Sequence, residues 1–415
     1  MNHSEKVDQD AVLRARTILL ESGRPSVARQ VEAYRVLSAV SPLTYGPKLV
    51  EALVSYGYQP EVRDLPEARL ARHAEAVAVA RRIDEGDPRR TELLVRALDS
   101  YQHGLYALGR RTEGLAVCEE MAAAGRWGFD HGQVQSPMYG HWRLSEVLAE
   151  EGRYDEAAEI CGKSVDAMRP LTPEDNSFWS VVRWVAALEA AGRQEAAIDA
   201  FAELVDITRA EVAADSTALA IQVWQLTHQA RMLDTADRRS GAAAARQEAL
   251  VLLAELDLTG ERKSWSNILS WWVTLLALSG RSAEPVPDAQ TPGPGFGAPY
   301  LDWSTDVRHA YFEGLETLEE QVAALREDPS TPLPELIAQH RRLTVRTAVY
   351  REQRHHRILK PLRPVFAEGV ALARRLGEPE SLREALTDRA MFLVAAMQYG
   401  EAYDDFREAC ELPVR

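Results

Sequence analysis

The residues of this chain best suited to chemistry form the acidic run from Asp404 to Glu408, where two aspartates and a glutamate flank Phe406 and Arg407. Carboxylate oxygens are the ligands that Mg²⁺ prefers, so such a run is a candidate metal site. A motif of this kind is meaningful only with its structural context, and no second acidic metal motif accompanies it. The run also falls inside a predicted helix whose packing side carries Phe406. We therefore expect it to be structural.

Other catalytic and cofactor-binding patterns are missing from the sequence. There is no His-Glu-x-x-His zinc helix, no nucleophile elbow and no dinucleotide-binding loop. The segment Gly293 to Gly297 is rich in glycine but lacks the Lys-Ser/Thr pair of a phosphate loop. The three cysteines have no zinc-ligand spacing. The sequence therefore predicts a protein that is not an enzyme and that holds no cofactor or metal.

Aromatic and charged residues suited to binding recur at fixed positions before a repeated turn. They lie 13, 10, 6 or 3 residues before the turn, a spacing that places them on one face of a helix. Large rings with a polar handle and arginines are typical binding anchors. The alternative is that the rings pack between neighbouring helices, as most large aromatic residues do. The candidate binding residues are Arg96, Asp99, His103, Tyr139, Trp142, Glu146, Trp179, Trp224, Arg231 and Asp234.

The repeated turn that positions these residues has a glycine or aspartate at its centre, followed by arginine. The turn residues Gly109, Gly152, Gly192, Asp237 and Gly280 are spaced 43, 40, 45 and 43 residues apart. A leucine precedes each turn by four residues, and a small residue follows the first four by five. Glycine ends a helix readily in the left-handed conformation, and a small residue lets two helices approach closely. The frame predicts consecutive helix pairs, with a further copy around Met397.

This frame resembles the tetratricopeptide-repeat superfamily. The segment from Gly152 to Ala158 is close to that family's turn, and Ala402, Phe406 and Ala409 match the small-large-small run of its second helix. The period of about 40–45 residues is longer than the family's usual 34. The resemblance implies an all-α fold, a right-handed α-solenoid of antiparallel helix pairs. It also implies that the first helix of each pair, which carries the candidate binding residues, lines a concave groove where partners bind.

The sequence predicts two helical parts separated by a break. Residues 1–280 are expected to form the helical-repeat domain and residues 301–415 a C-terminal helical segment ending in a similar helix pair. Between them, residues 281–300 contain five prolines, which no helix tolerates at this density. We expect residues 281–300 to be a linker or a surface loop.

Composition narrows the possible partners and the location. The net charge of −15 disfavours general nucleic-acid binding, which needs clustered positive charge. The basic helix 335–360 is the only candidate surface for nucleic acid or an acidic partner, and its alternative role is to pair with acidic residues of this chain. No signal peptide or membrane span is recognisable, so we expect a cytoplasmic protein without membrane contact. The arginine-rich composition is typical of an actinobacterial genome.

These observations favour a non-catalytic scaffold that binds a protein or peptide in its groove, with a regulatory role as a further expectation. Two alternatives remain open. One is a sensor that binds a small peptide or metabolite. The other is an α-helical enzyme whose pocket would lie between the repeats and the C-terminal helices. Oligomeric state and partner identity do not follow from the sequence.

Overall fold

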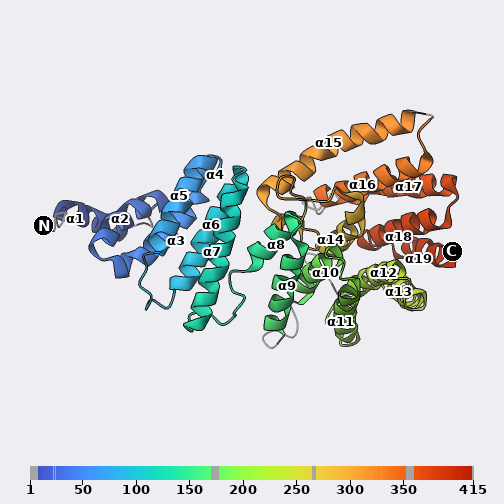
Figure 1. The fold of residues 1–415 in the computed structure, drawn as a ribbon, viewed down its shortest axis with the longest axis horizontal. Coiled ribbons are helices and arrows are strands. Elements are labelled where there is room, and N and C mark those ends of the chain that lie inside the picture. The colour runs from blue at the N-terminus through green and yellow to red at the C-terminus, as the bar shows by residue number, and fades with distance from the viewer. Residues whose placement is uncertain are drawn as a thin grey trace. The chain divides into compact units, whose positions relative to one another are not determined.

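The computed structural model describes residues 8–21, 23, 25–169, 177–263, 268–328, 330–351 and 359–413. Within these ranges the elements are α-helices and short 3₁₀ turns, and no strand is present (Figure 1). The all-α class predicted from the sequence is confirmed. Among the described residues no helix is both long and apolar enough to cross a membrane.

The chain divides into two compact units. The first comprises residues 1–147 with 304–306, and the second comprises residues 148–303 with 307–415. The helices up to the division are α1 (Gln9–Leu20), α2 (Val27–Val40), α3 (Pro42–Gly57), α4 (Pro60–Arg63), α5 (Pro66–Ala80), α6 (Arg90–Ala107), α7 (Arg111–Asp130) and α8 (Trp142–Glu150), which spans it. The helices beyond it are α9 (Tyr154–Met168), α10 (Ser177–Ala190), α11 (Gln194–Ala213), α12 (Leu219–Thr235), α13 (Arg239–Thr259), α14 (Ile268–Gly280), α15 (Thr305–Glu327), α16 (Leu333–Arg351), α17 (Leu359–Leu376), α18 (Pro379–Ala395) and α19 (Tyr399–Glu411).

Five of the six predicted turns share one backbone geometry. The central residue has a positive φ at Gly109, Gly152, Gly192, Asp237 and Met397. The next residue donates its N–H to the carbonyl of the leucine four residues before the turn, as from Arg153 to Leu148 at 2.9 Å. This bond satisfies a carbonyl left open at the helix end. The same bond closes all five turns, so a short local sequence sets each helix junction.

The small residues after the turns lie at close helix crossings. Ala157, Ala197, Ala242 and Ala402 are buried, and a Cβ at Gly114 would come within 2.7 Å of the Tyr106 ring. The leucines before the turns are buried too. The copy at Gly280 differs, because Gly280 keeps a φ of −91° and the chain continues into the 3₁₀ turn η1 (Arg281–Ala283). The same spacing of leucine, glycine and alanine also occurs at Leu19, Gly23 and Ala28, but there α2 begins only at Val27, capped by Ser26.

The proline-rich segment 281–300 lies inside the second unit, and the domain boundaries at 280 and 300 stay a prediction. The segment packs against its own unit: the Gly293 N–H donates to the Glu150 carbonyl at 2.9 Å. It leads into the 3₁₀ turn η2 (Tyr300–Asp302), and Tyr300 and Trp303 are buried. The Trp303 indole donates to the Gly295 carbonyl at 3.1 Å. The prolines therefore shape a packed loop.

Candidate functional site: a charged cavity in the second unit

The second unit contains a cavity of about 470 Å³. The ends of α10, α12 and α14 line it together with the start of α11, η1, α13, α18 and Phe406 of α19. In Figure 1, α12, α14 and α18 lie beside one another, although α18 is far from the other two in the sequence. The cavity therefore forms where helices from the repeats meet a helix of the C-terminal segment.

Two of the sequence-predicted binding residues, Arg231 and Asp234, line this cavity. They occupy the last turns of α12, at the positions 6 and 3 residues before the turn at Asp237. Thr227, ten residues before that turn, lines the cavity as well. In this repeat, the helix face predicted from the offsets is therefore the polar face of α12 that lines the cavity.

Charges of both signs line the cavity, and several are held by neighbouring groups. Arg246 of α13 pairs with Asp234. Arg281 donates to the Ala186 carbonyl at 2.6 Å and lies 3.6 Å from the Glu189 carboxylate. Burial raises the pKa of Glu189, although Arg281 opposes the shift. The cavity is therefore lined by both positively and negatively charged side chains.

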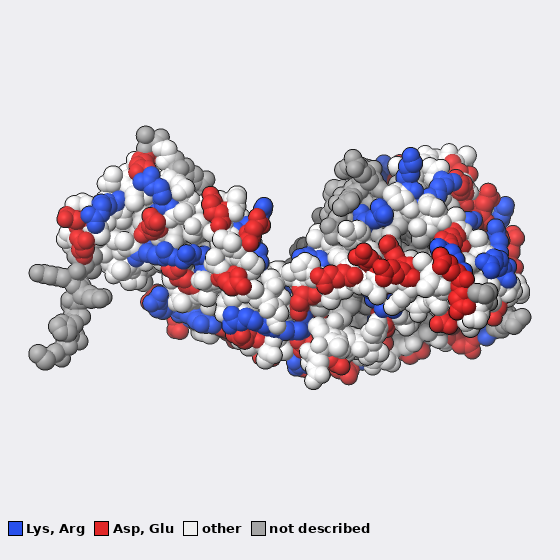
Figure 2. Space-filling view, turned by 90° about the horizontal axis from the view of Figure 1, so that it is seen from above, with Lys and Arg blue, Asp and Glu red and all other residues white. Residues whose placement is uncertain are grey.

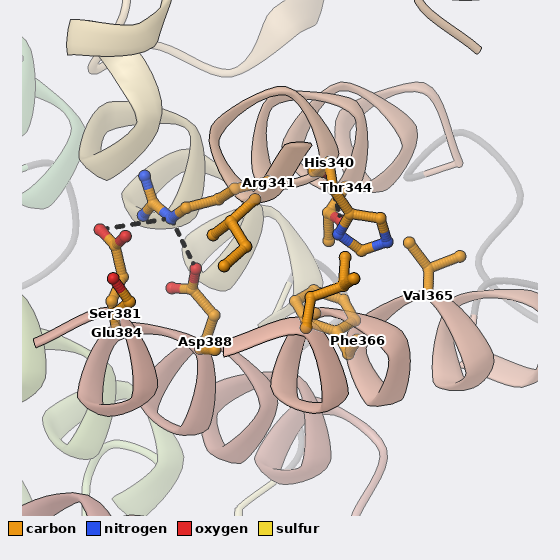
Figure 3. A pocket seen from close by; sticks show the side chains of 12 residues that line it. His340, Arg341, Thr344, Val365, Phe366, Ser381, Glu384 and Asp388 are labelled. Atoms are coloured by element: carbon orange, nitrogen blue, oxygen red, sulfur yellow. Dashed lines mark hydrogen bonds and ion pairs between the residues drawn. The ribbon is translucent and has the colours of Figure 1, made fainter. Parts of the chain in front are cut away.

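Asp388 of α18 bridges two arginines, one of which, Arg231, lines the cavity. Its Oδ1 accepts from Arg231 at 2.5 Å and its Oδ2 accepts from Arg341 of α16 at 2.9 Å. Figure 3 shows Arg341 between Asp388 and Glu384, beside a smaller cavity of about 30 Å³. Asp388 is only 5% exposed. Burial alone would raise the pKa of Asp388, but the guanidinium groups of Arg341 and Arg231 hold it below its ordinary value.

His228, also on α12, lines both the large cavity and an adjoining cavity of about 20 Å³. Its side chain is buried, and neither ring nitrogen has a hydrogen-bond partner among the described residues. Burial, together with the positive charges of Arg231 and Arg281, lowers the pKa of His228 to about 3. The imidazole is therefore neutral at ordinary pH, with one N–H donor and one nitrogen acceptor.

Lowering the pH is expected to weaken both units. Burial lowers the pKa of His73 in the first unit to about 4, as it lowers that of His228 in the second to about 3. An unfolded histidine has the ordinary value of 6.5, so below this pH the unfolded chain binds protons that the folded chain excludes. Stability is therefore undiminished above about pH 7 and falls as the pH drops, by about 1.4 kcal/mol per pH unit for each histidine.

Urea denaturation between about pH 7 and pH 5 measures this loss. Tryptophan fluorescence reports mainly on the second unit, which holds most of the tryptophans. His228→Leu removes one titrating group from that unit, so its stability should depend less steeply on pH than that of the wild type. Equal slopes for the two proteins would show that His228 does not stay neutral in the folded state.

Three arginines of the basic helix predicted at 335–360 are paired within the second unit. Arg341 contacts Asp388, and Arg342 and Arg346 both contact the buried carboxylate of Glu284, at 2.7 and 2.5 Å. These two guanidinium groups lower the pKa of Glu284, although burial opposes the shift. Residues 352–358 lie outside the described residues, including His355 and His356. On the face seen in Figure 2, basic and acidic side chains are interspersed.

Six predicted binding residues belong to the first unit. On α6, Arg96 and His103 are exposed, and His103 Nδ1 lies 2.8 Å from the Asp99 carbonyl. Near the start of α8, the rings of Tyr139 and Trp142 meet edge to face, and Trp142 is 39% exposed. Glu146 is buried against Arg143 at 2.5 Å, so its carboxylate already has a cation. The structure groups these residues on α6 and around α8, and a shared groove for all ten stays a prediction.

The two tryptophans predicted in the second unit pack against its other residues. Trp224 is 3% exposed, and its indole N–H donates to the Met391 carbonyl at 3.2 Å. Trp179 lies 4.7 Å from the Phe178 ring and 5.6 Å from the Trp271 ring, measured between ring centroids. Trp224 therefore packs between helices and is not available to anchor a partner, because its ring is buried and its indole N–H is already hydrogen-bonded.

The acidic run from Asp404 to Glu408 makes ion pairs. Asp405 binds Arg389 through both oxygens at 2.6 Å, and Asp404 lies 3.1 Å from Arg407. Within the described ranges, no group of three or more histidine, cysteine or acidic residues is arranged to hold a metal ion.

Sequence reasoning missed the contribution of α18 to the cavity. The offsets of 13 and 10 residues before the turn at Met397 give Glu384 and Thr387, and both line the cavity. The signal was therefore present in the last helix pair. It was overlooked because the offsets were applied only to the five turns from Gly109 to Gly280, although a turn at Met397 was also predicted. Asp388 and His228 lie outside the four offsets and had no such signal.

Comparison with models of known protein families finds no match, and comparison with curated proteins finds none either.

Proposed function

We propose that this protein is a non-catalytic helical-repeat scaffold that binds a peptide segment of a partner in the cavity of the second unit. The cavity itself carries the proposal: about 470 Å³ of space is lined by the same helix face on which the sequence placed Arg231 and Asp234. This volume falls in the range of about 300–1,000 Å³ that is usual for ligand sites. The mixed charges suit a peptide, which can present groups of both signs, better than a uniformly charged polymer.

The proposal keeps the arrangement implied by the sequence, a right-handed solenoid of antiparallel pairs similar to tetratricopeptide repeats, acting in the cytoplasm. Its support is the recurrence of the turn, the leucine and the small residue at a fixed period. In such a scaffold, first helices line the groove, and the cavity is lined by helices that precede three of the turns: α10, α12 and α18.

The cavity volume also favours a second candidate, a sensor of a short peptide or small metabolite. The enzymatic alternative needed a pocket between the repeats and the C-terminal helices, and this cavity occupies that place. Turnover of a diffusible substrate by the purified protein would favour the enzyme and contradict the scaffold.

Filling the cavity is expected to abolish peptide binding. Thr235 is the last residue of α12 and lines the cavity, so a tryptophan there would occupy the space of the bound peptide. A phage-displayed library of random linear peptides, selected on the full-length protein, supplies the probes. Their affinity for Thr235→Trp, measured by fluorescence polarisation, should fall by about tenfold or more, a loss of at least about 1.4 kcal/mol.

Thr259→Trp is the matched control. Thr259 is the last residue of α13, it is exposed, and its hydroxyl donates to the carbonyl four residues earlier, as that of Thr235 does. It does not line the cavity, so the control should keep wild-type affinity. Equal affinities for the two variants, or a selection that yields no peptide, would contradict the proposed site.

A further inference from the structure

His228 lines the cavity, and the hydrogen-bonding capacity of its two buried ring nitrogens is unused within the described part of the chain. The side chain is 5% exposed, and both ring nitrogens lack partners among the described residues. A buried polar group left unpaired costs about 1–3 kcal/mol, so such groups usually have a partner or a function. The unliganded protein therefore carries a group that weakens its fold.

The surroundings of His228 set which kind of ligand group it can bind. Arg231, one helical turn further along α12, and Arg281 line the same cavity. Two neighbouring cations disfavour protonation of the ring, so His228 meets a ligand as a neutral imidazole. A neutral imidazole offers one donor and one acceptor, and a main-chain amide offers one of each in return.

We propose that His228 is a binding residue whose imidazole hydrogen-bonds a main-chain amide of a peptide held in the cavity. This inference rests on the proposed function. It names the imidazole of His228 as the group by which the cavity would hold a peptide, whatever side chains the peptide carries. The competing occupant of the space around the ring is water, because the adjoining cavity of about 20 Å³ has room for about one molecule.

Gln225 provides a matched control on the same helix. Its side-chain amide is also buried and also has no partner among the described residues, but it does not line the cavity. Replacing either residue with leucine removes an unpaired buried polar group and should raise the melting temperature, by about 2 °C. Only the replacement of His228 should affect binding.

The experiment measures the affinity of the tightest-binding displayed peptide for three full-length proteins. The wild type and Gln225→Leu should bind equally, and His228→Leu should bind about tenfold more weakly, the loss expected for one hydrogen bond of about 1.4 kcal/mol. His228→Gln, which keeps a donor and an acceptor, should recover part of the affinity. If His228→Leu does not fold, the affinity of His228→Gln is compared with that of the wild type instead.

Replacing single main-chain amides of the peptide by esters then locates the partner. One ester should weaken binding to the wild type about tenfold and leave binding to His228→Leu unchanged, because the hydrogen bond is already absent there. If His228→Leu binds as tightly as the wild type, or no ester distinguishes the two proteins, then water alone uses the ring. That result overturns this inference and leaves the proposed function standing. A selection that yields no peptide overturns both.

Discussion

Replacing Asp388 with asparagine is expected to destabilise the second unit by about 3–5 kcal/mol, the usual cost of removing one partner from a buried ion pair. The carboxylate is buried between the guanidinium groups of Arg231 and Arg341. Without it, two arginines from different helices keep their charge, because arginine does not lose its proton in proteins. Their repulsion would separate α12 and α16 at the place where α18 now joins them.

Tryptophan fluorescence during urea unfolding measures this loss. The control is Asp404→Asn, the same chemical change in an exposed pair with Arg407, which should alter stability by no more than about 1 kcal/mol. A triple variant, Arg231→Met, Arg341→Met and Asp388→Leu, removes the whole charged group and should regain most of the lost stability. A loss for Asp388→Asn no greater than that of the control would show that the bridge does not hold these helices together.

Replacing Gly125 with alanine is expected to destabilise the first unit by about 1–3 kcal/mol, the usual cost of overpacking. Gly125 lies within α7, where alanine would normally be favoured over glycine. A Cβ there, however, would lie 1.7 Å from the Tyr139 carbonyl oxygen, which belongs to the backbone and cannot rotate away. The segment before α8 would have to move, which would cost more than the helix gains.

Gly46→Ala is the matched control. Gly46 also lies inside a helix, α3, but an added Cβ meets no atom within 4 Å other than its neighbours in the chain. This change should cost less stability than Gly125→Ala, because the gain from replacing a helical glycine offsets the contact of the new Cβ with the ring of Pro47. Hydrogen exchange in peptides from α3, α6 and α7 measures both effects. Stabilisation by both substitutions would mean that Tyr139 does not pack on Gly125.

The sequence was sufficient for features that depend on a few neighbouring residues. Each turn needs one residue that accepts a positive φ and one leucine four positions earlier, so Gly152 and Leu148 identified their turn without the rest of the fold. At Met397 the type of the central residue did not indicate a turn, although this methionine adopts the same conformation, with a φ of 56°. There, the leucine and alanine at the right spacing carried the prediction.

The composition of the cavity could not be predicted in the same way. Arg231 and its partner Asp388 are 157 residues apart, and nothing local to either residue indicates the other. Trp224 had the same offset as Tyr139 and Trp179, but α18 covers it, and an offset gives a helix face without saying what packs on that face. Similarly, proline content correctly ended the helix after Gly280 but did not reveal that Tyr300 and Trp303 would be buried.

The bridge formed by Arg231, Asp388 and Arg341 also limits how this sequence can diverge. Losing Asp388 leaves two guanidinium groups without their shared carboxylate, so its substitution alone should be selected against and replacements should occur jointly with those of the arginines. Among diverged relatives, the three positions are therefore expected to be retained or exchanged as a set. An arginine six residues before one turn, combined with an arginine in α16 and an aspartate nine residues before the last turn, is a signature for recognising such relatives.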